Sequence, residues 1–242
     1  MTIQALGPSV PFHAPLYASP PCRYTNSELQ LVSMVAAPEA VAALVPEPVV
    51  PNPDGQLVLM LNRLDADVFG RYHEAALLVP SSFEGVEGNF TAFMYLDEDR
   101  PNAAGREIWG WPKKHAMVDI EGDARIDSEV ARAGASIIQS RVDLSAELGP
   151  AEVALNPTFF NLKLIPSVRE GAPPDVMQIT ATTLQDVVIH RARGGTASVT
   201  LRSSKQDPLR RLSPREVQGA VCLQLDLTLG FGEVLHDYLR AG

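Results

Sequence analysis

The sequence predicts a mainly β protein with a few short helices. Most of its ordered segments are short apolar or alternating runs bounded by Gly, Pro, Asn or Asp, and this pattern is typical of strands. Few segments carry helix signals, and the chain contains neither an internal repeat nor a glycine-rich phosphate loop. Many strands with few helices favour a closed or nearly closed β architecture.

The first predicted elements are an arm and a helix. Residues 1–23 are rich in proline and are predicted to form an extended arm of the kind that often packs on a neighbouring subunit, although an irregular terminus has the same composition. Residues 38–44 form the clearest early helix, because a proline opens the first turn, where its missing N–H is tolerated. Pro46 and Pro48 end this helix.

Strands account for most of the remaining chain. Alternation or short apolar runs predict them at residues 29–35, 57–64, 72–79, 90–96, 135–144, 159–165, 176–182, 187–192, 197–201 and 223–227. One later segment differs, because residues 213–220 open with Ser-Pro-Arg-Glu. This opening is typical of a capped helix start, so we predict a second helix there.

The composition is that of a soluble globular protein. The 242 residues are 45% hydrophobic and 20% charged, which is ordinary for this class. The net charge of −9 and the pI near 5.0 disfavour binding to nucleic acid or to an anionic membrane. An acidic protein can still hold a local cationic pocket for a small carboxylate.

The cysteine content and the N-terminus favour a cytoplasmic location. Cys22 and Cys222 are the only cysteines, and their spacing fits neither a metal site nor a redox motif. Reduced thiols are the favoured interpretation, and a single disulfide is the alternative. No signal peptide or apolar run long enough to span a bilayer is recognisable.

The segment around Lys113 and Lys114 is the most informative part of the chain. The two lysines follow Pro112 and are flanked by Trp109 and Trp111. A lysine becomes a nucleophile at neutral pH when burial or a neighbouring cation destabilises its ammonium form. This segment offers both, and such an amine would form a Schiff base with a carbonyl substrate. The alternative is a pair of exposed lysines beside a turn.

Glu74 is the second candidate catalytic residue. In the predicted strand that contains it, alternation places Tyr72 and Glu74 on one face and His73 on the other. A carboxyl group that points into an apolar interior beside a lysine can move protons between substrate and solvent. Tyr72 can donate a hydrogen bond to a substrate oxygen, although core packing explains it equally well.

Other residues near the lysines are candidates for supporting roles. Met94 and Trp111 are candidate walls of a substrate pocket, but each also suits an ordinary core. Arg106 and Glu107 can position the lysine segment, although an ion pair between them is the favoured interpretation. The His and Asp residues show no metal-ligand spacing. No organic or metal cofactor is predicted, because a Schiff-base lysine itself acts as the electron sink.

The chain resembles the acetoacetate decarboxylase family, also called the acetoacetate decarboxylase-like superfamily. The motifs that carry the resemblance follow the family order over almost the whole chain: Val-Pro-Glu-Pro at 45–48, Tyr-Leu-Asp at 95–97, Gly-Arg-Glu at 105–107, Pro-Lys-Lys at 112–114, Leu-Lys-Leu-Ile-Pro at 162–166 and Asp-Tyr-Leu at 237–239. The resemblance implies one domain over residues 1–242, a β-barrel-based fold with an interior active site, and a homo-oligomer. It also implies that Lys113 is the Schiff-base nucleophile, Lys114 its electrostatic neighbour and Glu74 a functional carboxyl group.

Two positions depart from the family pattern. Ser27 stands where the family is expected to carry an arginine that grips the substrate carboxylate, and Leu59 stands, without gaps, where another glutamate is expected. A serine that binds substrate at this position cannot replace a bidentate guanidinium. We therefore expect aldolase or dehydratase chemistry on a small pyruvate-like oxo acid. Decarboxylation of acetoacetate is the alternative, with Arg63 or Arg71 as the clamp, and a non-catalytic ligand-binding protein is the third possibility.

Overall fold

The computed structural model describes residues 7–149 and 152–240. It confirms a mainly β fold with few short helices. Strands and helices follow one another in the order β1 (Cys22–Val35), α1 (Pro38–Ala42), β2 (Val50–Pro51), β3 (Gln56–Ala66), β4 (Gly70–Phe83), β5 (Val86–Leu96), α2 (Asp99–Ala104), the π-helix η2 (Gly105–Trp109), β6 (Lys113–His115), β7 (Met117–Gly122), β8 (Arg125–Arg132), β9 (Ala135–Leu148), β10 (Thr158–Ile165), β11 (Val176–Leu201), the 3-10 helix η4 (Leu209–Leu212), β12 (Glu216–Leu229) and β13 (Glu233–Asp237).

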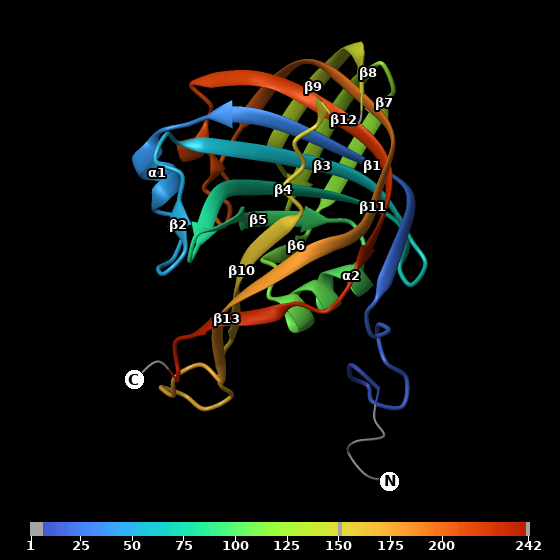
Figure 1. The fold of residues 1–242 in the computed structure, drawn as a ribbon. Helices are drawn as coiled ribbons and strands as arrows, with labels where there is room; N and C mark the ends of the chain where they lie inside the picture. Colours follow the sequence, from blue (N-terminus) through green and yellow to red (C-terminus); the bar gives the residue numbers. More distant parts are fainter. Residues whose placement is uncertain (1–6, 150–151, 241–242) are drawn as a thin grey trace.

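The long strands close into a barrel. The pairing order runs β10, β5, β4, β3, β1, β12 and β11, and β10 also pairs with β11, so the circle is complete. In Figure 1, β1, β3 and β4 run side by side along one wall of this barrel. Closure leaves these strands without a free edge along most of their length.

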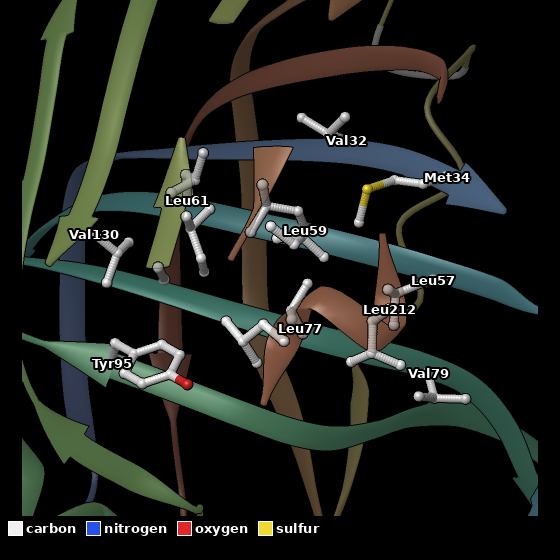
Figure 2. Close-up of a cluster of buried hydrophobic side chains, with 14 of the residues drawn as sticks. Val32, Met34, Leu57, Leu59, Leu61, Leu77, Val79, Tyr95, Val130 and Leu212 are labelled. Atoms are coloured by element: carbon white, nitrogen blue, oxygen red, sulfur yellow. The ribbon is translucent and has the colours of Figure 1, made fainter. Parts of the chain in front are cut away.

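A second layer packs on the outside of the barrel. The far half of β11 leaves β12 and pairs with β9, which continues the sheet to β8 and β7. These strands cross β1, β3 and β4 at an angle in Figure 1. Figure 2 shows the core between the layers, where Leu59 and Leu77 of the barrel wall lie in one cluster with Val130 of β8 and Leu212 of η4.

A separate apolar cluster fills the barrel itself. Alternate residues of the wall strands point inward and make up this cluster, which includes Tyr24, Leu29, Met60, Leu225 and Leu227. Because side chains alternate across a strand, each wall strand supplies one face to each cluster. Because both faces of the wall strands are buried, many of the predicted strands are apolar along their whole length.

The segment that carries the lysines joins the barrel wall at β5. α2 and η2 fold back after β5, and β6 then runs parallel to it, with Lys113 opposite Met94 and Lys114 opposite Tyr95. Gly110 ends η2 with a φ of 81°, a conformation that suits glycine. A Cβ atom at Gly110 would also lie 2.4 Å from Lys163 Cβ, so only glycine allows the segment to pack this closely against β10.

The structure corrects three local predictions. Residues 213–220 are not a helix, because β12 begins at Glu216 and pairs with both β1 and β11, whose ladders outweigh the local capping signal. The strands predicted at 176–182, 187–192 and 197–201 are one strand of 26 residues, bent at register shifts. The predicted arm ends at residue 21, where β1 starts, and its residues 1–6 lie outside the described part of the chain.

Among the described residues, none of the helices has the length and apolar character that crossing a bilayer requires.

Candidate active site

The interior of the barrel contains a cavity that every wall strand helps to line. The lining residues are Tyr24, Leu29, Met60, Asn62, Leu64, Tyr72, Glu74, Met94, Trp111, Phe159, Leu184, Leu227 and Leu229. About 50 Å³ of the cavity can take the centre of a water molecule, so it has room for a handful of waters or one small substrate. Its walls are mostly apolar, with a few polar groups among them, as is usual for ligand sites.

Lys113 reaches the interior of the barrel from β6. Its side chain is buried, and its Nζ lies 2.8 Å from Glu74 Oε2 and 4.7 Å from the centroid of the Trp111 ring. Because β6 pairs with β5, Lys113 stands opposite Met94 on the inner face. The structure therefore brings Lys113, Glu74, Met94 and Trp111 together, as the sequence predicts.

Glu74 and Tyr72 share the inner face of β4, and His73 points outward. Glu74 and Tyr72 are only 4% exposed, whereas His73 Nδ1 contacts Asp97 Oδ2 outside the barrel at 2.9 Å. The close contact between Lys113 and Glu74 lies outside hydrogen-bond geometry, and among the described residues Glu74 Oε2 has no aligned donor. Glu74 is therefore free to accept a hydrogen bond or a proton from a bound molecule.

Tyr24 is a cavity residue that the sequence analysis missed. Its hydroxyl lies 3.1 Å from that of Tyr72, and both rings are buried. Burial, the largest influence, raises the pKa of both tyrosines, so both stay neutral over the working pH range. One hydroxyl donates to the other, which leaves a proton for a substrate oxygen. Alternation with buried Cys22 was the one signal in the sequence that could have placed Tyr24 inside.

Lys114 points away from the cavity. Its Nζ donates to Asp207 Oδ1 at 2.7 Å and to the Gln206 carbonyl at 3.0 Å. Asp207 is fully buried outside the barrel wall and also contacts Arg132 Nη1 at 3.1 Å. Successive residues of a strand face opposite sides, so Lys113 inside requires Lys114 outside. An electrostatic effect of Lys114 on Lys113 would have to act across the sheet from an ammonium already paired with a carboxylate.

The two positions that depart from the family pattern lie away from the cavity lining. Ser27 sits in an irregular part of β1, and its hydroxyl accepts the backbone N–H of Asp65 at 3.1 Å. Leu59 faces the outer core, beside Leu61 and Leu77 in Figure 2. Leu59 does not face the cavity, because the inward residues of β3 are Met60, Asn62 and Leu64. Asn62 stands directly opposite Glu74.

Arg106 and Glu107 hold the lysine segment through different partners. Arg106 Nη1 donates to the backbone carbonyl of Lys113 at 3.0 Å. Glu107 accepts a hydrogen bond from the hydroxyl of Tyr17 in the N-terminal arm. An ion pair between Arg106 and Glu107 is not found among the described residues, so positioning of the segment is the role that their contacts support.

Gly105 provides the space for the Lys113 side chain. A Cβ atom at this position would lie 2.5 Å from Lys113 Cδ and 2.7 Å from Cε. We expect Gly105→Ala to displace the amine and to lower the rate of covalent trapping by roughly 100-fold, because misplacement by about 1 Å has such effects. Gly105 has a φ of −59°, so alanine suits its backbone, and a melting curve can verify that the fold survives.

A double-variant control separates this contact from general damage. In the parent background the close contact with Lys113 should also lower the melting temperature of Gly105→Ala. In a Lys113→Ala background the clash disappears, so the same substitution should leave the melting temperature unchanged. An equal loss of stability in both backgrounds would contradict the proposed contact.

The described residues contain no group of three or more His, Cys, Asp or Glu side chains that could hold a metal ion. The polar and aromatic groups of the described residues at the cavity include a carboxyl group, two phenols, an amide and an indole, with the Lys113 amine in contact with the carboxyl group.

Comparisons with known proteins identify relatives over nearly the whole chain. The family model described as acetoacetate decarboxylase (ADC) matches residues 9–239. The chain is 33% identical over 249 aligned residues to the acetoacetate decarboxylase of Ralstonia nicotianae, with 98% of each chain covered. The crystal structure of acetoacetate decarboxylase from Legionella pneumophila superposes with a TM-score of 0.89 at 28% identity, covering 94% of this chain and 92% of that one.

A more distant structure shares the fold alone. The enduracididine biosynthesis enzyme MppR, complexed with the condensation product of pyruvate and imidazole 4-carboxaldehyde, superposes with a TM-score of 0.83 at 19% identity and covers 98% of this chain and 99% of that one. With the extent of the family match and the identity to the Ralstonia enzyme, the chain belongs to the acetoacetate decarboxylase family.

Proposed function

We propose that this protein is a Schiff-base-forming carbon–carbon lyase that decarboxylates a small β-keto acid. The observation that carries the proposal is the buried Lys113 amine, which lies 2.8 Å from Glu74, a residue in the wall of a mostly apolar cavity. The relatives at 33% identity are named acetoacetate decarboxylases, which favours decarboxylation over the aldol chemistry that Ser27 and Leu59 suggested.

The reaction begins with transfer of a proton from the Lys113 ammonium to Glu74, which converts a buried ion pair into two neutral groups. The free amine attacks the keto carbon and forms a carbinolamine, which loses water to give a protonated imine. The bond between the α carbon and the carboxylate then breaks, and its electron pair moves into the imine. Carbon dioxide leaves, and an enamine remains.

Glu74 closes the cycle. As a carboxylic acid it protonates the enamine carbon, and water then hydrolyses the resulting imine to release the ketone and the Lys113 amine. Glu74 gives up two protons per turnover, one to the departing hydroxyl group and one to the enamine. The first comes from the Lys113 ammonium and the second is taken from water, because decarboxylation consumes one proton overall. The single carboxyl group thus serves as base and acid in turn, which requires the short contact between the two side chains.

The apolar walls of the cavity lower the barrier to loss of carbon dioxide. Arg63, proposed above as a clamp, binds Glu28 at 2.5 Å and backbone carbonyls outside the barrel, and Arg71 is exposed beside Asp65 at 2.8 Å. A substrate carboxylate in the cavity would instead lie among leucines, methionines and phenol hydroxyls. Its charge is poorly solvated there and disperses as the bond breaks, which favours the transition state.

Aldol or dehydration chemistry on a pyruvate-like oxo acid is the second candidate. It is favoured by the cavity lining, in which no guanidinium occurs among the described residues. An imine on Lys113 would serve this chemistry equally well, because both reactions pass through an enamine. Assembly into a homo-oligomer and a cytoplasmic location stay predictions.

The test is borohydride reduction followed by intact-mass spectrometry, with acetoacetate and pyruvate supplied separately. We expect carbon dioxide release and an isopropyl adduct on Lys113 from acetoacetate. A pyruvate adduct without any decarboxylation of acetoacetate would favour the second candidate. Tight binding of either acid with neither an adduct nor turnover would instead favour a ligand-binding protein.

Glu74→Gln should uncouple imine formation from turnover. Glutamine fills the same space but cannot take the proton of Lys113 or return it to the enamine. We expect kcat to fall by roughly 100-fold to 10,000-fold, the range typical for loss of a positioned acid–base group. Stopped-flow measurement of product release checks this prediction. Leu64→Met, which changes another cavity wall without touching proton transfer, is the matched control, and an equal fall in both variants would contradict the role of Glu74.

A further inference from the structure

We propose that Asn62 is a positioning residue for imine formation, whose side-chain amide binds the oxygen of the substrate as the ketone becomes a carbinolamine. The inference rests on the proposed function, because it assigns a partner to the oxygen that Lys113 displaces. Neither the resemblance nor any motif in the sequence pointed to this residue.

Asn62 lies at the reacting end of the cavity. It stands opposite Glu74 in the ladder between β3 and β4, and opposite Leu29 of β1 on its other side. Side chains at directly opposed positions have Cβ atoms about 4.5–5.5 Å apart. Glu74 in turn contacts the Lys113 amine. A single side chain, that of Glu74, therefore links the Asn62 amide to the proposed nucleophile.

The side-chain amide of Asn62 is buried, and one of its hydrogen-bonding atoms has no partner among the described residues. Asn62 is 2% exposed, and its Oδ1 has no hydrogen-bond partner among the described residues. A buried polar atom without a partner is costly, and such atoms in native proteins call for an explanation. Its place in the cavity lining provides one, because a bound molecule can supply the missing donor.

The chemistry of an amide matches that of the carbinolamine. A ketone oxygen only accepts hydrogen bonds, whereas the hydroxyl group of a carbinolamine both donates and accepts. A carboxamide offers one carbonyl acceptor and two N–H donors side by side. Asn62 can therefore bind the hydroxyl in two ways but the ketone in only one, and an interaction that strengthens along the reaction accelerates it.

The arrangement also orients the departing water. With the hydroxyl held by Asn62, the carboxylic acid of Glu74 on the neighbouring strand can protonate it as the C–O bond breaks. The electron pair on the Lys113 nitrogen forms the C=N bond, and water leaves. Asn62 transfers no proton in this scheme, so its contribution is positional.

The experiment compares Asn62→Leu with Leu61→Met, a change at the adjacent residue of the same strand, which faces the outer core. Single-turnover trapping with borohydride and acetoacetate is the readout. We expect Asn62→Leu to slow adduct formation by roughly tenfold or more with little change in KM. Leu61→Met should stay within about twofold of the parent rate, since it exchanges one apolar side chain for another of similar volume outside the cavity.

A thermal melt separates this role from a structural one. Because Asn62 Oδ1 has no hydrogen-bond partner in the described part of the chain, leucine should leave the melting temperature unchanged or raise it. A lower melting temperature with an unchanged trapping rate would overturn the proposal and make Asn62 structural. Failure of the parent protein itself to form an adduct would instead refute the Schiff-base function. An adduct that forms equally fast in parent and Asn62→Leu would refute the inference alone.

Discussion

Lys113→Ala is expected to abolish covalent trapping by borohydride and to reduce turnover by roughly 10,000-fold or more, since removal of a covalent nucleophile has effects of this size. The Lys113 amine contacts Glu74 in the cavity wall, and the described residues that line the cavity include no other amine. Alanine also leaves Glu74 buried without its cation, so proton transfer to the substrate is lost together with the nucleophile. Intact-mass spectrometry after reduction measures the first effect, and carbon dioxide release measures the second.

Lys114→Ala is the matched control, because it removes the adjacent amine from the other side of the sheet. Lys114 contacts Asp207, and Arg132 remains to balance that carboxylate after the substitution. We expect the trapping rate to stay within about tenfold of the parent rate. If Lys114→Ala abolished trapping as completely as Lys113→Ala, the assignment of the nucleophile by strand direction would be wrong.

Asp207→Asn is expected to lower the free energy of unfolding by roughly 3–5 kcal/mol, the usual result of breaking a buried ion pair from one side. Asp207 is fully buried and accepts hydrogen bonds from Lys114, Arg132, Tyr95 and Ser204. Asparagine cannot balance the two cations, which would remain partly buried. Urea denaturation followed by fluorescence measures the loss.

Asp127→Asn is the control for this prediction. Its ion pair with Arg141 lies on the surface, with both side chains about half exposed, so its loss should cost about 0–1 kcal/mol. Equal losses for the two variants would show that the Asp207 cluster contributes no more than a surface pair.

The Asp207 cluster also predicts a pH dependence of stability. Burial opposes the charge of Asp207, but hydrogen bonds from Lys114, Ser204 and Tyr95 outweigh it, so its pKa lies below the usual 3.8. A carboxyl group with a lowered folded-state pKa contributes stability above its unfolded-state pKa and loses it as the pH falls. The stability difference between the parent protein and Asp207→Asn should therefore narrow below about pH 4.

The inner face of β4 and the lysine segment were predictable from local pattern. Alternation placed Tyr72 and Glu74 together and His73 apart, as the structure has them. The aromatic surroundings of Lys113 indicated burial. These inferences hold because side-chain direction in a strand depends only on the residue count along it.

Other features required the tertiary structure, because they depend on partners distant in sequence. The partner of Lys114 is Asp207, 93 residues away. The bulge in β1 that turns Ser27 toward Asp65 arises where the register between β1 and β3 shifts. Likewise, residues 213–220 became part of a strand because β1 and β11 offered ladders on both sides.

The sequence by itself therefore determined the mainly β class, the segment that holds the proposed nucleophile and the inward face of β4, since each depends on short-range periodicity or on a motif. Only the tertiary structure decided which residues meet across the barrel. Asn62 and Tyr24 reach the cavity because strand register sets them opposite or beside Glu74 and Tyr72. Register is set by closure of the whole sheet, and a shift by one residue would have turned each of them outward.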